Sequence, residues 1–318
     1  MAPKVLLVGA GQLGSRHLQG LAHCGVPLEI HVSDPSAESL ERARARWLEV
    51  AGAGTSHRVS FASGVASLPP AVDVAIVATS AGGRAAFVEE IARRCMVQAW
   101  VLEKVLAQSE GELDAIVAAT AAAKYASVNV PRRLMGWHRE LKAATATQAP
   151  TMGIVRGGDW GLACNAVHFL DYMAWWTGET LVEVCTDQLA PRWHASKRPG
   201  YWEINGRLHV RYSQGSELVL DCAAEAGPLV ITLRAADGEW TLREAEKSAA
   251  HSDGRSLPGR NEFQSEMTGT VVQSILESGS CGLPSLEESV ALHRIFLRSL
   301  LAHWNSHEAE RVSRLPIT

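Results

Sequence analysis

The stretch from Lys4 to Asp34 constrains the fold of this chain more than any other. Its apolar run Val5 to Val8 is β-branched at both ends and apolar on both faces, which is typical of a strand buried in a parallel sheet. This run leads into a G-x-G-x-x-G pattern, and a second apolar run, Leu28 to Val32, ends just before an acidic residue. The order strand, glycine turn, helix, strand indicates a dinucleotide-binding unit.

Each glycine of this pattern has its own expected role. Gly9 permits the tight turn, Gly11 lets the backbone approach a pyrophosphate, and Gly14 lets the helix pack closely on the strand. The free N–H groups at the start of the helix attract phosphates without any basic side chain. We therefore expect this loop, including Gln12 and Leu13, to bind the cofactor.

Asp34 predicts which dinucleotide binds. It lies 20 residues after Gly14, close to the spacing at which a carboxylate accepts both hydrogen bonds from an adenosine ribose. The same carboxylate would repel a ribose 2′-phosphate, so we expect NAD rather than NADP. The alternative is that Asp34 helps to open the helix after Pro35, where a short polar side chain caps free N–H groups, and the two roles are compatible.

Length and composition limit the classes to which the chain can belong. At 318 residues it is long enough for two domains, and 47% hydrophobic residues with a net charge of −4 argue against disorder, nucleic-acid binding and an anionic membrane partner. Six cysteines without C-x-x-C spacing indicate neither a zinc site nor a dense disulfide framework, so we expect no metal and a reduced, cytoplasmic setting. The first strand starts too early for a signal peptide, and every apolar run is too short to cross a bilayer.

Strands and helices alternate through the first part of the chain. This alternation predicts right-handed βαβ units and a doubly wound parallel sheet of the Rossmann type, in a domain from residue 1 to 125. After the opening unit, we expect helices at 36–48, Arg84–Arg94 and Leu113–Lys124, and strands at Val59–Phe61, Val72–Ala78, Trp100–Glu103 and Ser127–Val130.

The second part, residues 126–318, is dominated by polar segments of period two that are separated by short Gly-containing turns. They predict an open, mainly antiparallel sheet in a second α/β domain. The expected strands are Leu181–Thr186, Glu203–Tyr212, Glu217–Cys222, Val230–Leu233 and Trp240–Leu242, and the expected helices are Asn165–Thr177, Asn261–Glu277 and Leu286–Trp304.

Several motifs spread over nearly the whole chain carry a family resemblance. They are GAGQLGSRHLQGL, VDVAIVATS, LEKVLAQS, NVPRRLMGWHRELK, NAVHFLDYMAWWTGE and LPSLEESVALH. Together they resemble the glucose-fructose oxidoreductase, inositol dehydrogenase and rhizopine-catabolism (Gfo/Idh/MocA) family. The resemblance implies an N-terminal NAD-binding domain and a C-terminal domain for substrate binding and oligomer contacts. It also implies hydride transfer between NAD(P) and a hydroxyl or keto group of a sugar, cyclitol or nucleotide-sugar.

The resemblance gives Lys104 a catalytic role at the C-terminal end of a parallel strand. Its cation would contact the nicotinamide side and stabilise alkoxide character as the hydride leaves, with Glu103 orienting it and Thr79 and Ser80 contributing to the cofactor site. The alternative is an ordinary surface lysine. Val105 stands where the family has proline, so we expect a trans peptide bond before it.

His168 is the candidate general base, because imidazole titrates near neutral pH and can take the hydroxyl proton. The spacing places Asn165, His168, Trp175 and either Asp171 or Tyr172 on one helical face, although a helical histidine is often structural. The family commonly has an aspartate four residues before this histidine. Here that position is Cys164, so we expect no carboxylate partner there and expect Asn165 to hold a substrate hydroxyl.

Arginines and tryptophans add further candidates for substrate binding. Near the predicted cleft, three arginines either clamp a carboxylate or phosphate or are simply solvated: Arg132, Arg133 and Arg156. Trp160, Trp175 and Trp176 offer a flat apolar face for a sugar ring. Trp175 and Trp176 point about 100° apart on a helix, so we expect at least one of them in the core. The predicted substrate-binding set is thus Asn165, Arg133, Asp171 and Trp160.

Two other functions and the oligomeric state remain open. The chain is alternatively a redox-sensing or regulatory NAD binder without turnover, or, as the family resemblance allows, a glycosidase or lyase that uses tightly held NAD. We expect a homodimer or homotetramer formed through an apolar face of the second domain's sheet. That face would carry Trp202, Ile204, Leu208, Val210 and Tyr212, unless the domain's own helices cover these residues.

Overall fold

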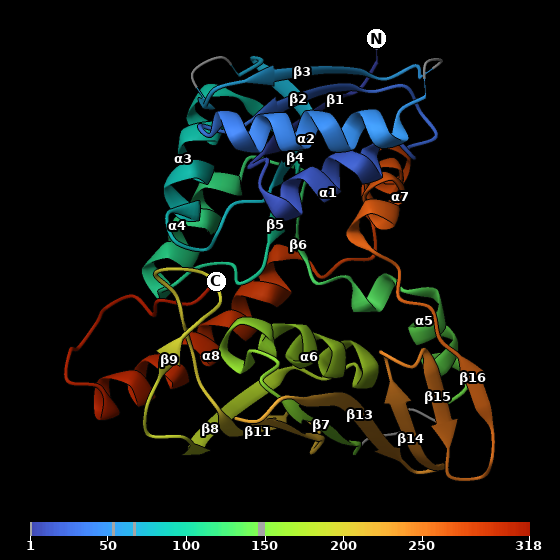
Figure 1. Cartoon of the computed structure of the whole chain (residues 1–318), viewed down its shortest axis with the longest axis vertical. Coiled ribbons are helices and arrows are strands. Elements are labelled where there is room, and N and C mark those ends of the chain that lie inside the picture. The colour runs from blue at the N-terminus through green and yellow to red at the C-terminus, as the bar shows by residue number, and fades with distance from the viewer. Residues whose placement is uncertain (1, 53–54, 66–67, 146–149) are drawn as a thin grey trace. The chain divides into compact units, whose positions relative to one another are not determined.

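The computed structural model describes residues 2–52, 55–65, 68–145 and 150–318. The chain forms two compact units, each assembled from separate segments (Figure 1). The first unit comprises Met1–Leu106, Gly111–Asn129 and Glu262–Leu286, and the second comprises Ala107–Glu110, Val130–Asn261 and Glu287–Thr318. A single boundary near residue 125 does not describe this division, because Glu262–Leu286 joins the first unit.

The first unit contains a six-stranded sheet with the order β3-β2-β1-β4-β5-β6. Every neighbouring pair is parallel, so the predicted doubly wound parallel sheet is confirmed. The strand order reverses between β1 and β4, which is where open α/β sheets bind their ligands. The strands are β1 (Lys4–Val8), β2 (Glu29–Ser33), β3 (Arg58–Ala62), β4 (Ala71–Val77), β5 (Met96–Glu103) and β6 (Tyr125–Asn129).

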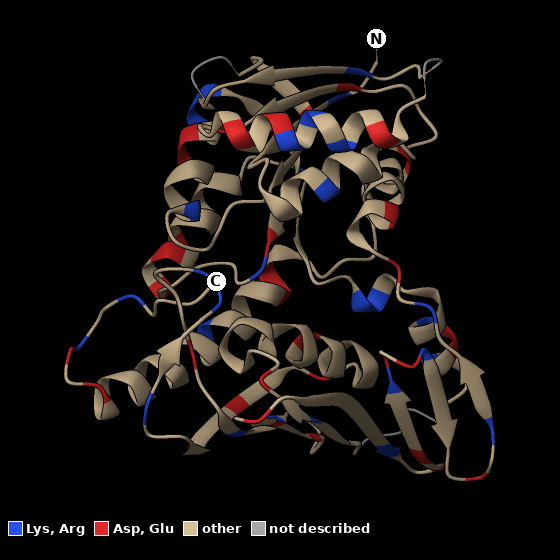
Figure 2. Cartoon of the chain, viewed as in Figure 1, with Lys and Arg blue, Asp and Glu red and all other residues tan. Residues whose placement is uncertain are grey.

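The helices of this unit are α1 (Gln12–Leu21), α2 (Ala37–Val50), α3 (Arg84–Arg94), α4 (Glu110–Thr120) and α7 (Gln264–Ser278). Helix α7 joins from the far end of the sequence because glycines let it approach α1 closely. A Cβ on Gly20 would lie 2.7 Å from Cβ of Thr268, and one on Gly269 would lie 2.6 Å from the carbonyl oxygen of Gly20. Helix α2 buries only Ala43 and Trp47, and charges of both signs alternate along its exposed side (Figure 2).

The second unit contains an eight-stranded sheet with the order β16-β15-β14-β13-β7-β12-β11-β8. Only β7 and β12 pair in parallel, which confirms the predicted mainly antiparallel sheet. Its strands are β7 (Met152–Gly158), β8 (Leu181–Leu189), β11 (Gly206–Tyr212), β12 (Glu217–Ala223), β13 (Gly227–Ala235), β14 (Gly238–Arg243), β15 (Ser248–His251) and β16 (Ser256–Pro258). The remaining elements are a β9 (His194–Ala195) and β10 (Trp202–Glu203) pair, the 3-10 turn η2 (Pro131–Leu134), and helices α5 (Gly136–Ala143), α6 (Leu162–Thr177) and α8 (Leu286–His307).

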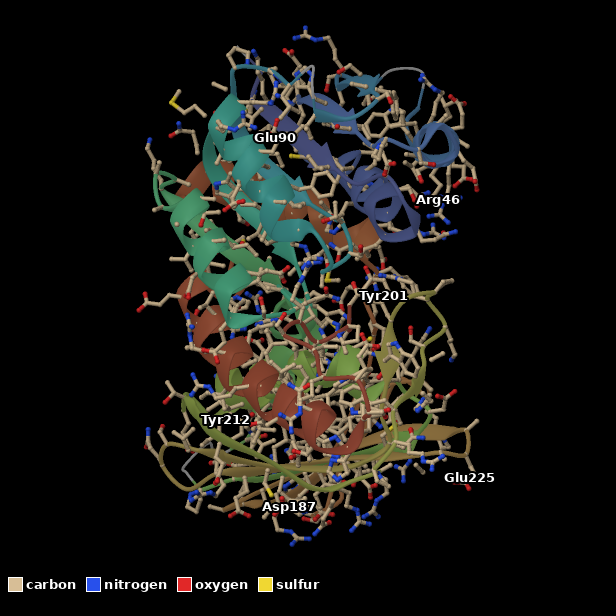
Figure 3. All side chains as sticks on the ribbon, turned by 90° about the vertical axis from the view of Figure 1, so that its left-hand side faces the viewer. Arg46, Glu90, Asp187, Tyr201, Tyr212 and Glu225 are labelled. Carbon is tan, nitrogen blue, oxygen red and sulfur yellow. The ribbon has the colours of Figure 1, made fainter. Side chains whose placement is uncertain are left out.

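Four of the five side chains expected to form an apolar face for contacts between copies of the chain instead lie under the unit's own helices, and only Trp202, at 37%, is exposed among the five. Ile204, Leu208, Val210 and Tyr212 are at most 3% exposed. The Tyr212 hydroxyl donates a hydrogen bond to the carbonyl oxygen of Leu170 in α6, at 2.9 Å. Tyr212 lies on the helix side of the sheet and Asp187 on the opposite side (Figure 3). The expectation was wrong because the alternation along β11 points its apolar residues inward and its charged residues outward.

None of the helices in the described residues is long and apolar enough to span a membrane.

Candidate cofactor and substrate sites

The glycine loop joins β1 to α1 and leaves open space at one position. Gly9 has a φ of +92°, and a Cβ there would lie 2.9 Å from the carbonyl carbon of Ala78, just after β4. A Cβ on Gly14 would lie only 1.8 Å from the carbonyl oxygen of Gly9, so the first turn of α1 requires a glycine at this position. A Cβ on Gly11 would meet nothing within 4 Å. The loop thus packs tightly against β4 and remains open at the position where a pyrophosphate approaches in this class of site.

Arg46 of α2 holds the first turn of α1. Its guanidinium donates to the carbonyl oxygen of Gln12 at 2.9 Å and to the side-chain oxygen of Gln12 at 2.7 Å. Gly11, the N-cap of α1, offers no side chain to cap the helix. Leu13 is 37% exposed. The free N–H groups of this turn are therefore accompanied by a cation, and both favour an anionic ligand (Arg46 is labelled in Figure 3).

Asp34 is fixed directly beside this loop. One carboxylate oxygen accepts a hydrogen bond from the Ala10 N–H at 2.6 Å, and the other accepts one from the Ser36 N–H at 2.8 Å. Ser36, rather than Asp34, caps α2 by accepting from the Ser39 N–H. A carboxylate has about four lone-pair sites, so Asp34 can still accept hydrogen bonds from a ribose.

Thr79 and Ser80 follow β4 and are half-buried. The backbone nitrogen of Thr79 would lie 3.1 Å from a Cβ on Gly9, so this segment lines the same end of the sheet as the glycine loop. The predicted cofactor residues of the first unit therefore gather at the C-terminal ends of β1, β2 and β4. This arrangement fits NAD, because it offers backbone N–H groups, an open glycine and a carboxylate in the order that the dinucleotide requires.

Glu103, the last residue of β5, precedes Lys104, and its side chain is buried and hydrogen-bonded. Its carboxylate accepts a hydrogen bond from the Asn129 amide and lies 2.9 Å from Nε2 of His17. Burial alone would raise the pKa of Glu103, but the hydrogen bonds from His17 and Asn129 and the charge of Arg84 hold that pKa below its usual value. We overlooked His17 in the sequence. The available signal was its place three residues after Gly14, on the same side of α1.

The peptide bond between Lys104 and Val105 is cis, so the expectation of a trans bond was wrong. Carbonyl groups on both sides of this bond accept hydrogen bonds from the buried guanidinium of Arg84. Arg84 therefore binds both sides of this turn. Lys104 itself is half-buried.

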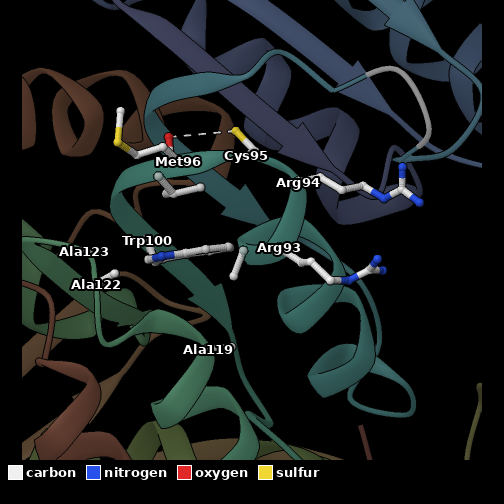
Figure 4. A pocket seen from close by; sticks show the side chains of 10 residues that line it. Arg93, Arg94, Cys95, Met96, Trp100, Ala119, Ala122 and Ala123 are labelled. Atoms are coloured by element: carbon white, nitrogen blue, oxygen red, sulfur yellow. Dashed lines mark hydrogen bonds between the residues drawn. The ribbon is translucent and has the colours of Figure 1, made fainter.

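The other end of β5 carries a separate pocket of about 300 Å³ (Figure 4). Trp100 and Met96 line it beside Cys95, where the strand begins. Ligands of parallel sheets bind at the carboxyl ends of the strands, so this pocket is not the candidate cofactor site.

In the second unit, each of the three arginines considered for a substrate clamp pairs with a carboxylate of the chain itself, and the clamp stays a prediction. Arg133 binds Asp171 through two nitrogens, with Nε 3.1 Å from Oδ2. Arg132 binds Glu244 in the same bidentate way, at 2.9 and 3.0 Å. The third, Arg156, is exposed on β7, where its Nε lies 3.2 Å from a carboxylate oxygen of Asp221.

Arg133 and Asp171 also line a cavity of about 300 Å³ within this unit, together with Trp175, Glu179 and Glu288. Burial raises the pKa of Asp171 to about 6, although Arg133 opposes this rise. This carboxyl group therefore changes charge close to neutral pH. A ligand in this cavity would contact an Arg133 that is already paired with Asp171, and the charge of Asp171 would depend on pH.

Asn165 and Trp160 lie at the N-terminal end of α6. The Asn165 amide donates to the carbonyl oxygen of Trp160 at 2.8 Å, and the Trp160 indole donates to the carbonyl oxygen of Asp221 at 3.0 Å. Glu203 of β10 accepts hydrogen bonds from the N–H groups of Ala163 at 2.8 Å and Cys164 at 3.3 Å. A carboxylate from a distant strand therefore binds backbone N–H groups in the first turn of α6, which is a different role from that of the His168 partner expected to be missing at position 164.

His168 lies one turn after Cys164 on α6 and is half-buried. Trp176 is fully buried, which confirms that one member of the tryptophan pair belongs to the core. Trp175 is half-buried, and Nζ of Lys142 lies 4.5 Å from the centre of its ring. One aromatic face of α6 is thus already in contact with a cation of the chain.

A metal site is not evident in the part of the chain that the structure describes: no three His, Cys, Asp or Glu side chains there are grouped so that they could hold an ion.

No protein-family model matches the chain, and no curated protein matches it. Solved structures do match it over nearly its whole length. An oxidoreductase from Agrobacterium radiobacter, in complex with NAD+, L-tartaric acid and magnesium, has a TM-score of 0.71 and 15% identity, covering 96% of this chain and 97% of that chain. The chain therefore shares the fold of this structure.

Two further structures share this fold. A UDP-N-acetylglucosamine 3-dehydrogenase from Acidithiobacillus ferrooxidans has a TM-score of 0.66 and 14% identity, covering 95% of this chain and 97% of that chain. A myo-inositol 2-dehydrogenase from Lactobacillus plantarum has a TM-score of 0.67 and 15% identity, with coverage of 95% and 97%.

Proposed function

We propose that this protein is an NAD-dependent oxidoreductase that transfers a hydride between nicotinamide and a hydroxyl or keto group of a sugar, cyclitol or nucleotide-sugar. The observation that carries the proposal is the edge of the parallel sheet where Gly11 faces open space beside the fixed carboxylate of Asp34. The substrate class rests on the similar structures, two of which act on a cyclitol and on a nucleotide-sugar.

Within this proposal, the chain's own residues bind and orient the reactants. Bound NAD would supply the hydride acceptor. The N–H groups at the start of α1 hold the pyrophosphate, and Asp34 accepts hydrogen bonds from the adenosine ribose. The ammonium of Lys104 stabilises negative charge on the reacting oxygen, and His168 takes the hydroxyl proton.

An assay with NAD and a panel of sugars, cyclitols and nucleotide-sugars tests the proposal. We expect net formation of NADH with at least one of them, followed by absorbance at the NADH band. Turnover of a glycoside without net NADH would instead establish the NAD-assisted glycosidase or lyase. Binding of NAD without turnover on the whole panel would establish the regulatory binder.

Cofactor choice is tested separately by calorimetry. We expect NAD to bind more tightly than NADP, because Asp34 would face the 2′-phosphate with no basic residue at Pro35 or Ser36. Equal or tighter binding of NADP would remove Asp34 from the ribose site.

We also propose a cytoplasmic homodimer or homotetramer formed through the outer face of the eight-stranded sheet. Helices α6 and α8 lie on one side of this sheet (Figure 1). On its other side, Ile154 pairs in register with Val219 and with Thr232, and the ion pairs of Arg156 and Arg207 with Asp221 flank them. Light scattering at micromolar concentration should give a multiple of the 34.2 kDa chain mass, and a monomer mass would contradict this proposal.

A further inference from the structure

Arg84 is unusual both in its place at the start of a helix and in its burial. It is the first residue of α3, where the positive end of the helix dipole disfavours a cation, and its side chain is 0% exposed. A buried charge is costly unless it is paired and hydrogen-bonded. Residues that break local rules in this way are expected at functional positions, where the surrounding structure compensates them.

Backbone carbonyl groups at the ends of β4 and β5 accept hydrogen bonds from the buried guanidinium of Arg84 and so compensate its charge. One terminal nitrogen of Arg84 donates to the carbonyl oxygens of Glu103 and Val105 and, at 3.1 Å, to that of Leu106. The other terminal nitrogen donates to the carbonyl oxygen of Thr79. One planar guanidinium therefore ties the segment after β4 to the turn after β5, and an ammonium has no such fork of donors.

The two segments that Arg84 joins carry residues proposed for the cofactor and the chemistry. Thr79 follows β4, and Lys104 lies between the carbonyl groups of Glu103 and Val105 that Arg84 holds. The charge of Arg84 also favours ionised Glu103, whose carboxylate is bound by His17 and Asn129. The guanidinium and this carboxylate thus stabilise each other in a buried place.

We propose that Arg84 is the positioning residue of the cofactor edge: by binding the carbonyl groups on either side of Lys104 and that of Thr79, it holds both segments in the arrangement that NAD binding and hydride transfer require. This proposal rests on the proposed function. Arg84 acts through the backbone and does not itself contact the reacting atoms. A buried arginine with no role beyond stability is the competing explanation, and the two differ in what happens to folded variants.

Two variants and one matched control separate these explanations. Arg84→Lys keeps the charge but loses the planar fork, and Arg84→Ala leaves a space that a guanidinium ion can enter. Arg94→Ala removes an exposed arginine of the same helix, which pairs with Glu90. Circular dichroism and thermal unfolding first establish the temperature at which each variant is folded, and all measurements are made below it.

For folded Arg84→Lys we expect the Kd for NAD to rise about tenfold, which corresponds to about 1.4 kcal/mol. We expect kcat on the substrate found in the panel assay to fall by a similar factor. Added guanidinium chloride at low millimolar concentration should restore part of the NAD affinity of Arg84→Ala and leave Arg94→Ala unchanged. A purely structural arginine would lower the melting temperature without these effects.

Several outcomes overturn the proposal. NAD affinity and turnover of folded Arg84→Lys within twofold of the parent would show that the fork does not position the site. Failure of both variants to fold would also overturn it, because Arg84 would then be required for the fold as a whole. If the parent binds NAD but oxidises nothing in the panel, the proposed activity fails, while the affinity and rescue measurements still decide the role of Arg84.

Discussion

The two units use their polar residues in different ways. At the cofactor edge of the first unit, the groups available to a ligand are backbone N–H groups, an open glycine and the remaining lone pairs of Asp34. Around α6 of the second unit, the polar side chains proposed for the substrate already have partners within the chain, as Arg133 binds Asp171 and Asn165 binds the backbone carbonyl of Trp160. A site made of backbone is specified by a short local motif, whereas a site made of side chains depends on which distant partners they meet.

The largest effect is expected on the rate of the chemical step, when one proposed catalytic residue from each unit is replaced. Lys104→Ala and His168→Ala should each lower the rate of the chemical step by about 10²- to 10⁴-fold, because both act mainly in the transition state. Single-turnover kinetics on the substrate found with NAD measures this rate. Lys124→Ala and His209→Ala, at exposed positions, are the matched controls. Rates within threefold of the parent would show that these residues are not catalytic.

The next effect concerns the buried ion pairs of the second unit. Burial by itself would raise the pKa of Glu244, but Arg132 and His138 hold that pKa at about 2. Because the folded-state pKa lies below the unfolded value of 4.5, the stabilisation is complete above pH 4.5 and is lost as the pH falls towards 2. By linkage it amounts to about 3 kcal/mol.

Glu244→Gln tests this stabilisation. Urea unfolding at pH 6 should show a parent that is about 3 kcal/mol more stable than the variant, and the difference should shrink at pH 3. Glu239→Gln, which breaks the exposed pair with Arg234, is the control. A difference between parent and Glu244→Gln that does not change between pH 6 and pH 3 would contradict the role given to this carboxylate.

Two glycines of the cofactor loop distinguish packing from ligand binding. Gly14→Ala should cost about 1–3 kcal/mol of stability, since the new methyl group would collide with the carbonyl oxygen of Gly9. Gly11→Ala meets no neighbour, so its melting temperature should match the parent while its NAD affinity falls about tenfold, or about 1.4 kcal/mol. Gly111→Ala, also in open space, controls for both measurements. Unchanged NAD affinity in Gly11→Ala would place the pyrophosphate elsewhere.

The smallest effect is expected for an exposed ion pair of the first unit. Arg42 pairs with Glu38 one turn away on α2, and the Glu38 side chain is 84% exposed. Arg42→Ala should therefore change the free energy of unfolding by less than about 0.5 kcal/mol, as measured by urea unfolding. A loss of several kcal/mol would mean that exposed and buried pairs contribute alike, which would remove the contrast drawn between α2 and the Arg132–Glu244 pair.

Much of the architecture was predictable because it depends on local patterns. Helix α3 begins and ends at the predicted residues, Arg84 and Arg94, and the parallel pairing of the first sheet follows from alternating strands and helices. Helix α5 and strands β15 and β16 carried no recognised signal. The face of β11 was assigned to the wrong side, because period-two alternation identifies two faces but does not say which one the helices cover.

By itself, the sequence determined the locally encoded features of this protein. These are the glycine loop, the acid after β2 and the parallel sheet that carries both. These features depend on residues within one βαβ unit, where spacing alone dictates geometry. Only the tertiary structure decided that Arg84 binds carbonyl groups of two strand ends, that Glu203 reaches α6, and that the arginines are paired with carboxylates. The physical reason is that a long polar side chain binds whichever partner folding brings within about 3 Å, and sequence distance says nothing about that.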